Sequence, residues 1–175
     1  KLLGLALVFQ AWLPVPLAAV LLGLLALLLA VRFVGWRPGL GFTRIDLAVM
    51  YLGYLAIVAQ LLLESLALRG GVAWTGSLPT HVFTFGAMGL VIPAMLVRIS
   101  LGHTGRKVVF DGLDRLVVHI MLLAFVVRVV LPQWFPGAYV HWVHLAAVAW
   151  SLAFAVLGFR LTPRLLAPRV DGREH

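Results

Sequence analysis

The segment His81–Arg106, HVFTFGAMGLVIPAMLVRISLGHTGR, decides the fold, because it has the length of one membrane crossing and ends in a basic turn. No Asp, Glu, Lys or Arg occurs between His81 and Val97, and about 20 apolar residues are enough to cross the hydrocarbon core of a bilayer as a helix. At about 1.5 Å of rise per residue, His81 and His103 lie about 33 Å apart along that helix. We therefore expect a transmembrane helix whose two histidines cannot bind the same metal ion.

Two neighbouring faces of this helix have different compositions. Steps of three and four residues from His81 place one stripe of side chains on a single face, which comprises His81, Phe85, Met88, Ile92, Met95 and Ile99. The next face carries Gly86, Gly89 and Pro93. Small residues let another backbone approach closely in lipid, and they equally admit a flat cofactor. The spacing leaves both interpretations open.

Two separated motifs resemble the NnrS family of bacterial membrane proteins. The first consists of His81, the step Gly86–Gly89 (GAMG), Arg98 and the run SLGHTGR over residues 100–106, and the second is PRVDGR over residues 168–173. The resemblance implies haem b, with copper as a further metal, and a role in the nitric oxide response, in nitrosative stress or in denitrification.

The resemblance also bears on how much of a protein this chain represents. It implies a histidine at the position of Tyr51, so one family ligand is missing from the sequence. It implies further membrane helices ahead of Lys1, and we expect residues 1–175 to form a single transmembrane domain at the C-terminal end of a longer protein. The expected location is the bacterial inner (cytoplasmic) membrane.

The composition independently indicates an integral membrane protein. Hydrophobic residues make up 63% of the 175 residues and charged residues 11%, a mixture that one soluble core of this size could not bury. The chain has no cysteine, which excludes disulfides, thiolate metal sites and covalently attached c-type haem. The net charge of +8 comes from residues at the expected helix ends, so it indicates membrane topology and not nucleic-acid binding.

An all-α bundle of about five spans follows from the hydrophobic segments, which cover residues 12–35, 45–68, 81–101, 113–131 and 138–160. The first and third connections and the C-terminal tail are rich in arginine, whereas the second has only Arg69 and the fourth has no charge. Positive residues are retained in the cytoplasm. We therefore expect the C-terminus to be cytoplasmic and His81, His141 and His144 to lie on the periplasmic side.

Polar side chains within the second and fourth segments are costly in lipid and need partners. Glu64 either reaches the outer interface near Arg69 or serves as a proton carrier or a partner of a histidine ligand; Tyr54 lies in the same segment. Arg128 either extends to the outer interface or pairs with Glu64 or with a haem propionate. His119 is either a ligand near the cytoplasmic side or a histidine hydrogen-bonded between helices.

The remaining candidates lie at helix ends. The turn containing His103 and Arg106 is either a glycine helix cap with cytoplasmic charge or an anion site for a lipid headgroup or a propionate. His141 and His144 are spaced for a chelate or for one axial ligand and a neighbour, and they equally suit an interfacial belt of aromatic residues.

The sequence offers one set of candidate residues and supports two hypotheses of function. The candidates for haem or metal ligands are His81, His141, His144, His119 and His103, those for contacts to ligands, propionates or other anions are Arg98, Arg106, Arg128, Glu64 and Tyr54, and those for helix packing are Gly86 and Gly89. The first hypothesis is a haem b protein, with copper, of the bacterial nitric oxide response. The alternative is a cofactor-free structural or assembly subunit of a larger respiratory membrane complex. The lipid bilayer and further membrane helices or subunits are the expected partners, and nucleic acid is not.

Overall fold

The computed structural model describes residue 8 and residues 12–70 and 72–172, and in that part of the chain the regular structure is helical. Five helical segments there are long and apolar enough to cross a membrane: Val15–Gly35, Ile45–Leu68, Leu78–His103, Gly112–Trp134 and Pro136–Leu166. The predicted all-α transmembrane bundle of about five spans is confirmed. The last segment continues past the predicted end at Arg160 and through Pro163.

The first two spans form a pair. Helix α2 (Val15–Gly35) lies along α4 (Ile45–Leu68), and the short helix α3 (Pro38–Gly41) connects them. Small residues bring the two backbones together: the Ser65 hydroxyl donates to the carbonyl of Ala19 at 2.7 Å, and a Cβ on Gly23 would lie 3.1 Å from Ser65 Oγ. Close approach of this kind is how helices associate in lipid.

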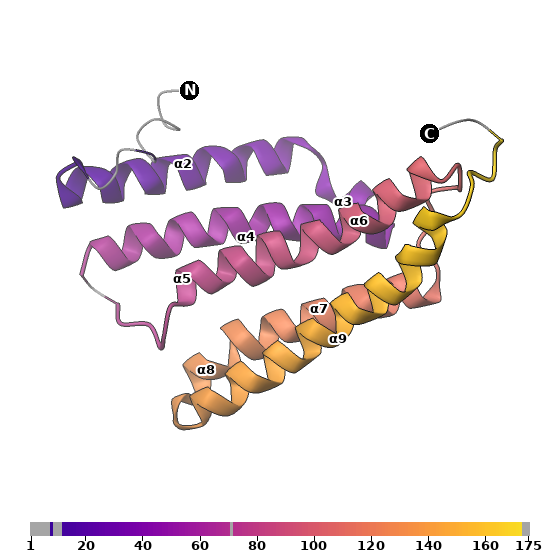
Figure 1. The fold of residues 1–175 in the computed structure, drawn as a ribbon. Helices are drawn as coiled ribbons and strands as arrows, with labels where there is room; N and C mark the ends of the chain where they lie inside the picture. Colours follow the sequence, from indigo (N-terminus) through magenta and orange to yellow (C-terminus); the bar gives the residue numbers. More distant parts are fainter. Residues whose placement is uncertain (1–7, 9–11, 71, 173–175) are drawn as a thin grey trace.

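The third span joins this pair to a second pair of helices. It comprises α5 (Leu78–His81), η2 (Val82–Met88) and α6 (Gly89–His103), and it contacts α4 on one side and α7 (Gly112–Val129) and α9 (Tyr139–Leu166) on the other. Figure 1 shows α2, α4 and α6 in succession, with α7 and α9 running side by side below them. Two short helices, α8 (Leu131–Trp134) and η3 (Pro136–Ala138), connect α7 to α9.

The third span is not a uniform α-helix. The turns over Val82–Met88 are widened, with the backbone N–H of Gly89 bonded to the carbonyl of Thr84, five residues earlier. Pro93 has no N–H to donate to the carbonyl of Gly89, and prolines in helices cause such local adjustments. The two faces predicted for this helix differ in burial: Met88, Ile92, Met95 and Ile99 of the stripe are exposed, while Gly86, Gly89 and Pro93 of the neighbouring face are buried.

The two ends of the bundle differ in charge. We call "basic end" the one that carries α3, the loop 104–111 and residues 167–172, because ten of the described cations lie there: Arg32, Arg37, Arg44, Arg98, Arg106, Lys107, Arg115, Arg160, Arg164 and Arg169. At this end Asp111 caps α7 by accepting from the N–H groups of Leu113 and Asp114. The "opposite end" carries the loop 69–77 and α8, where the Gln133 amide exchanges two hydrogen bonds with the backbone of Thr75.

A matched pair of glycine substitutions tests the packing of the third span. A Cβ on Gly86 would lie 2.7 Å from Ala56 Cβ and 2.8 Å from the ring of Phe125, whereas nothing lies within 4 Å of one on Gly158. We expect Gly86→Ala to lower the free energy of unfolding by about 1–3 kcal/mol through overpacking. Gly158→Ala should leave it unchanged or raise it by up to about 1 kcal/mol. Thermal unfolding of the two variants in detergent measures the difference, and equal stability would show that the face of Gly86 is not tightly packed.

Candidate functional site

Near the opposite end, three polar side chains from three spans meet. The Nη2 atom of Arg128 on α7 lies 2.8 Å from Nε2 of His81 and 3.2 Å from the hydroxyl of Tyr139 on α9. The guanidinium carbon also lies 5.3 Å from the centre of the Tyr139 ring, within the range of a cation–π contact. Arg128 is only 8% exposed, so this cluster links the third, fourth and fifth spans inside the bundle.

The hydrogen bonds of His81 assign its ring nitrogens. Nδ1 lies 2.7 Å from the carbonyl of Ser77 and must carry a proton to bond it, and Nε2 then accepts from Arg128. A metal-binding histidine commonly donates one ring N–H to a carbonyl in this way. Here, however, the lone pair that would bind a metal is directed at a guanidinium, which carries a positive charge.

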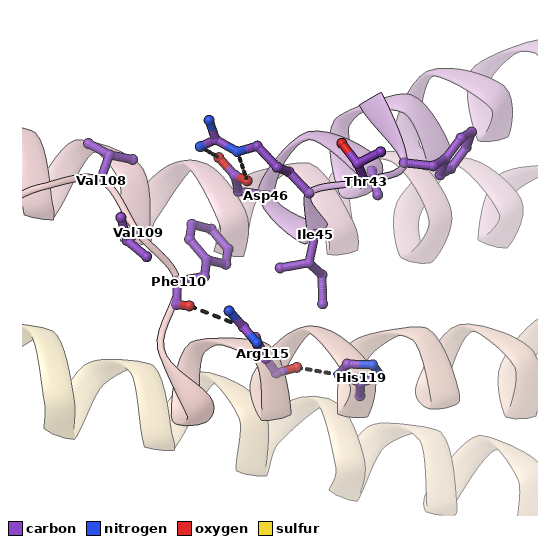
Figure 2. Close-up of a pocket in the computed structure, with 11 residues that line it drawn as sticks. Thr43, Ile45, Asp46, Val108, Val109, Phe110, Arg115 and His119 are labelled. Carbon is purple, nitrogen blue, oxygen red and sulfur yellow. Dashed lines mark hydrogen bonds and ion pairs between the residues drawn. The ribbon is translucent and has the colours of Figure 1, made fainter. Parts of the chain in front are cut away.

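A pocket of about 650 Å³ opens at the basic end, between the start of α4, the loop 104–111 and α7. Figure 2 shows Ile45 above Arg115 and His119, with Phe110 and Val109 closing one side. Most of its walls are apolar, and they are formed by Phe42, Ile45, Ala48, Val108, Val109 and Phe110. A largely apolar cavity with a few directed polar groups is the usual form of a small-molecule site, and such sites measure roughly 300–1,000 Å³.

The polar residues that line this pocket are Thr43, His119, Arg44, Arg115 and Asp46, whose charge is paired. His119 Nδ1 lies 2.6 Å from the carbonyl of Arg115, and its Nε2 makes no hydrogen bond within the part of the chain that the structure describes. Arg115 donates from Nε to the carbonyl of Phe110 at 3.2 Å (Figure 2). The Asp46 carboxylate is buried and bonds Arg44 at 2.9 Å and Arg98 at 2.5 Å, so its charge is compensated.

The two sequence motifs that lie far apart in the chain are in contact. The backbone N–H of Val170 donates to the carbonyl of Thr104 at 3.2 Å. A Cβ on Gly105, whose φ is +75°, would lie 2.8 Å from the carboxyl carbon of Asp171. Asp171 also bonds Arg169, and this hydrogen bond raises the pKa of the Arg169 guanidinium. The segment 168–172 therefore packs on the turn that ends α6; Arg173 lies outside the described residues.

The other predicted site residues do not join either group. His103, His141 and His144 are exposed, and within the described residues no three His, Cys, Asp or Glu side chains are arranged to hold a metal ion. Tyr54 donates to the carbonyl of Leu29 at 3.1 Å and stacks on Phe33, so it links α2 to α4. Among the ion pairs of the described residues, Glu64 pairs with neither Arg69 nor Arg128.

Two groups of charges were not anticipated from the sequence. One is Asp46 with Arg98, and the other joins Asp111 and Asp114 on α7 to Arg160 on α9, with Arg164 3.9 Å from Asp111. Asp46 lies in the first turn of its helix. Acids are common there, because they are stabilised by the helix dipole, so the position did not indicate an ion pair with another helix. The spacing of four residues between Arg160 and Arg164 puts both on one helix face, and it was the available signal for the second group.

The described fold and its polar groups define a multi-pass helical membrane protein with buried charges at both ends. The sequence profile described as NnrS protein matches residues 1–169. The chain therefore belongs to the NnrS family, and this membership suggests a role in the nitric oxide response. No curated protein and no solved structure matches the chain.

Replacing Asp46 tests the charge balance beside the pocket. Asp46→Asn leaves Arg44 and Arg98 without their acid, and we expect the free energy of unfolding to fall by about 1–3 kcal/mol, less than for a fully buried pair because both arginines are partly exposed. Lys107→Gln, a change at an exposed cation outside the ion pairs, should stay within about 0.5 kcal/mol. Unfolding in detergent compares them; equal effects would mean that Asp46 contributes no more than a surface charge.

Proposed function

We propose that this protein is a haem b-containing membrane protein of the bacterial nitric oxide response, located in the cytoplasmic membrane. Family membership supports the nitric oxide response. The observation that carries the haem assignment is the pocket at the basic end, where a histidine with an unbonded Nε2 lies beside an apolar cavity of about 650 Å³. Haem, when bound, supplies an iron atom that binds gases such as nitric oxide.

The chemistry of the pocket fits a haem group better than the cluster at the opposite end does. His119 donates from Nδ1 to a carbonyl and leaves Nε2 for a metal, which is the arrangement of a ligand held in a fixed orientation. Arg115 and Arg44 line the same pocket and can bind the propionates, and the apolar walls can contact the ring. At His81 the corresponding lone pair already accepts from Arg128.

This assignment makes His119 the proposed iron ligand and leaves His81, the histidine of the family motif, as the second candidate. The described residues bring no three metal-binding side chains together, so we assign no copper site. The cofactor-free subunit is the second candidate function, and the occupied lone pair of His81 favours it.

Histidine variants separate these candidates. We expect His119→Ala to lose most of the haem from membranes and His103→Ala to retain it, because His119 lines the pocket and His103 does not. The Soret absorbance per unit of protein is the measurement, with His81→Ala as the third variant. Loss of haem only in His81→Ala would place the iron at the opposite end. A purified wild-type protein without a Soret band would support the cofactor-free subunit.

The proposed orientation places the basic end in the cytoplasm. Ten of the described cations lie at that end, and positive residues near membrane spans are retained on the cytoplasmic side. A green fluorescent protein fused after His175 should therefore fluoresce, and an alkaline phosphatase fused there should be inactive. An active phosphatase fusion would reverse the bundle in the membrane.

A further inference from the structure

Arg128 is a buried cation that forms no ion pair with the described residues. Ion pairs occupy four of the six acids in the chain, namely Asp46, Asp111, Asp114 and Asp171, and all of them bond arginines at the basic end. Glu64 forms no ion pair within the part of the chain that the structure describes, and Glu174 lies outside that part. An arginine that is 8% exposed within a membrane span needs a negative partner, because an uncompensated charge there is costly.

The hydrogen bonds of Arg128 leave much of its guanidinium unused. Both of its hydrogen bonds come from Nη2, to His81 and to Tyr139. A guanidinium has five N–H donors, so the N–H groups of Nε and Nη1 have no acceptor among the described residues. Both acceptors are neutral groups. The hydrogen bonds therefore compensate neither the remaining donors nor the charge.

We propose that Arg128 binds a small planar anion with two oxygen atoms, such as a carboxylate or nitrite, and that the anion releases His81. Such an anion matches the guanidinium fork and forms two parallel hydrogen bonds. Each of the two forks of a guanidinium includes one N–H of Nη2, and the two N–H groups of Nη2 now bond His81 and Tyr139. Two-pronged binding therefore displaces one of these acceptors, and in this proposal the displaced acceptor is His81. The hydroxyl of Tyr139, which now accepts from Nη2, retains its own proton to donate to the anion.

The consequence is a histidine whose Nε2 is masked in the absence of the anion and free in its presence. Arg128 is the binding residue, Tyr139 assists it, and His81 reports occupancy. The inference uses only these three side chains and does not depend on the haem assignment at the basic end, which is tested by other variants.

Thermal unfolding tests the anion site. The detergent-solubilised full chain is unfolded with formate or nitrite, with chloride as the comparison at equal ionic strength. Either planar anion, at about tenfold above its dissociation constant, should raise the midpoint by about 3–5 °C over chloride. Lys107→Gln, at an exposed cation outside both the pocket and the ion pairs, should keep this increase, and Arg128→Gln should lose it. An increase of the same size in both variants, or none in the wild type, would overturn the site.

A second measurement uses the wild-type protein and does not require any variant to fold. Diethyl pyrocarbonate modifies neutral imidazole nitrogens, and peptide mass spectrometry gives its rate at each histidine. Formate should increase the rate at His81 several-fold and leave the rate at His103, which is exposed and lines neither site, unchanged. Equal rates at His81 with formate and with chloride would contradict the release of this histidine.

Discussion

The bundle depends on the close contact between α4 and the third span. A Cβ on Gly53 would lie 2.4 Å from Val91 Cγ2 and 3.5 Å from the carbonyl of Ala87, and one on Gly86 would meet Ala56 from the other side. Lipid offers no hydrophobic driving force between helices, so van der Waals contact at this distance is what holds them together. The contact fixes α4 against the helix that carries His81, and this helix in turn packs on α7 and α9.

The ion pairs of the described residues all lie at the basic end of the bundle. At the basic end, aspartates on α4 and α7 bond arginines from α6 and α9, so that the ion pairs tie together helices that are distant in sequence. One result is that the polar side of the pocket carries surplus cations while its acid, Asp46, is already engaged. The surplus makes the pocket suitable for a ligand that carries carboxylates, and the apolar walls require the rest of that ligand to be hydrophobic.

The sequence predicted the five helices because length and hydropathy alone determine a membrane span. It did not predict the widened turns of Val82–Met88, which depend on how the backbone accommodates Gly86, Gly89 and Pro93. The sequence also did not predict the partners of Arg128. Depth in the membrane made Glu64 and a propionate equally suitable partners, whereas rotation of α7 turns the guanidinium toward His81 and Tyr139. The rotation of a helix about its axis is set by packing against its neighbours. It cannot be predicted from the spacing of residues along that helix alone.

His81 and His119, the two candidate iron ligands, differ in the partner of their Nε2 atom. His81 and His119 both donate from Nδ1 to a backbone carbonyl four residues earlier, so their rings are oriented by the same local device. What separates them is the partner of Nε2: a guanidinium at His81 and a cavity at His119. A family motif identifies the residue but not this partner, since the partner comes from another helix. The capacity of each histidine to bind a metal is therefore a property of α7 and its neighbours as much as of the histidine itself.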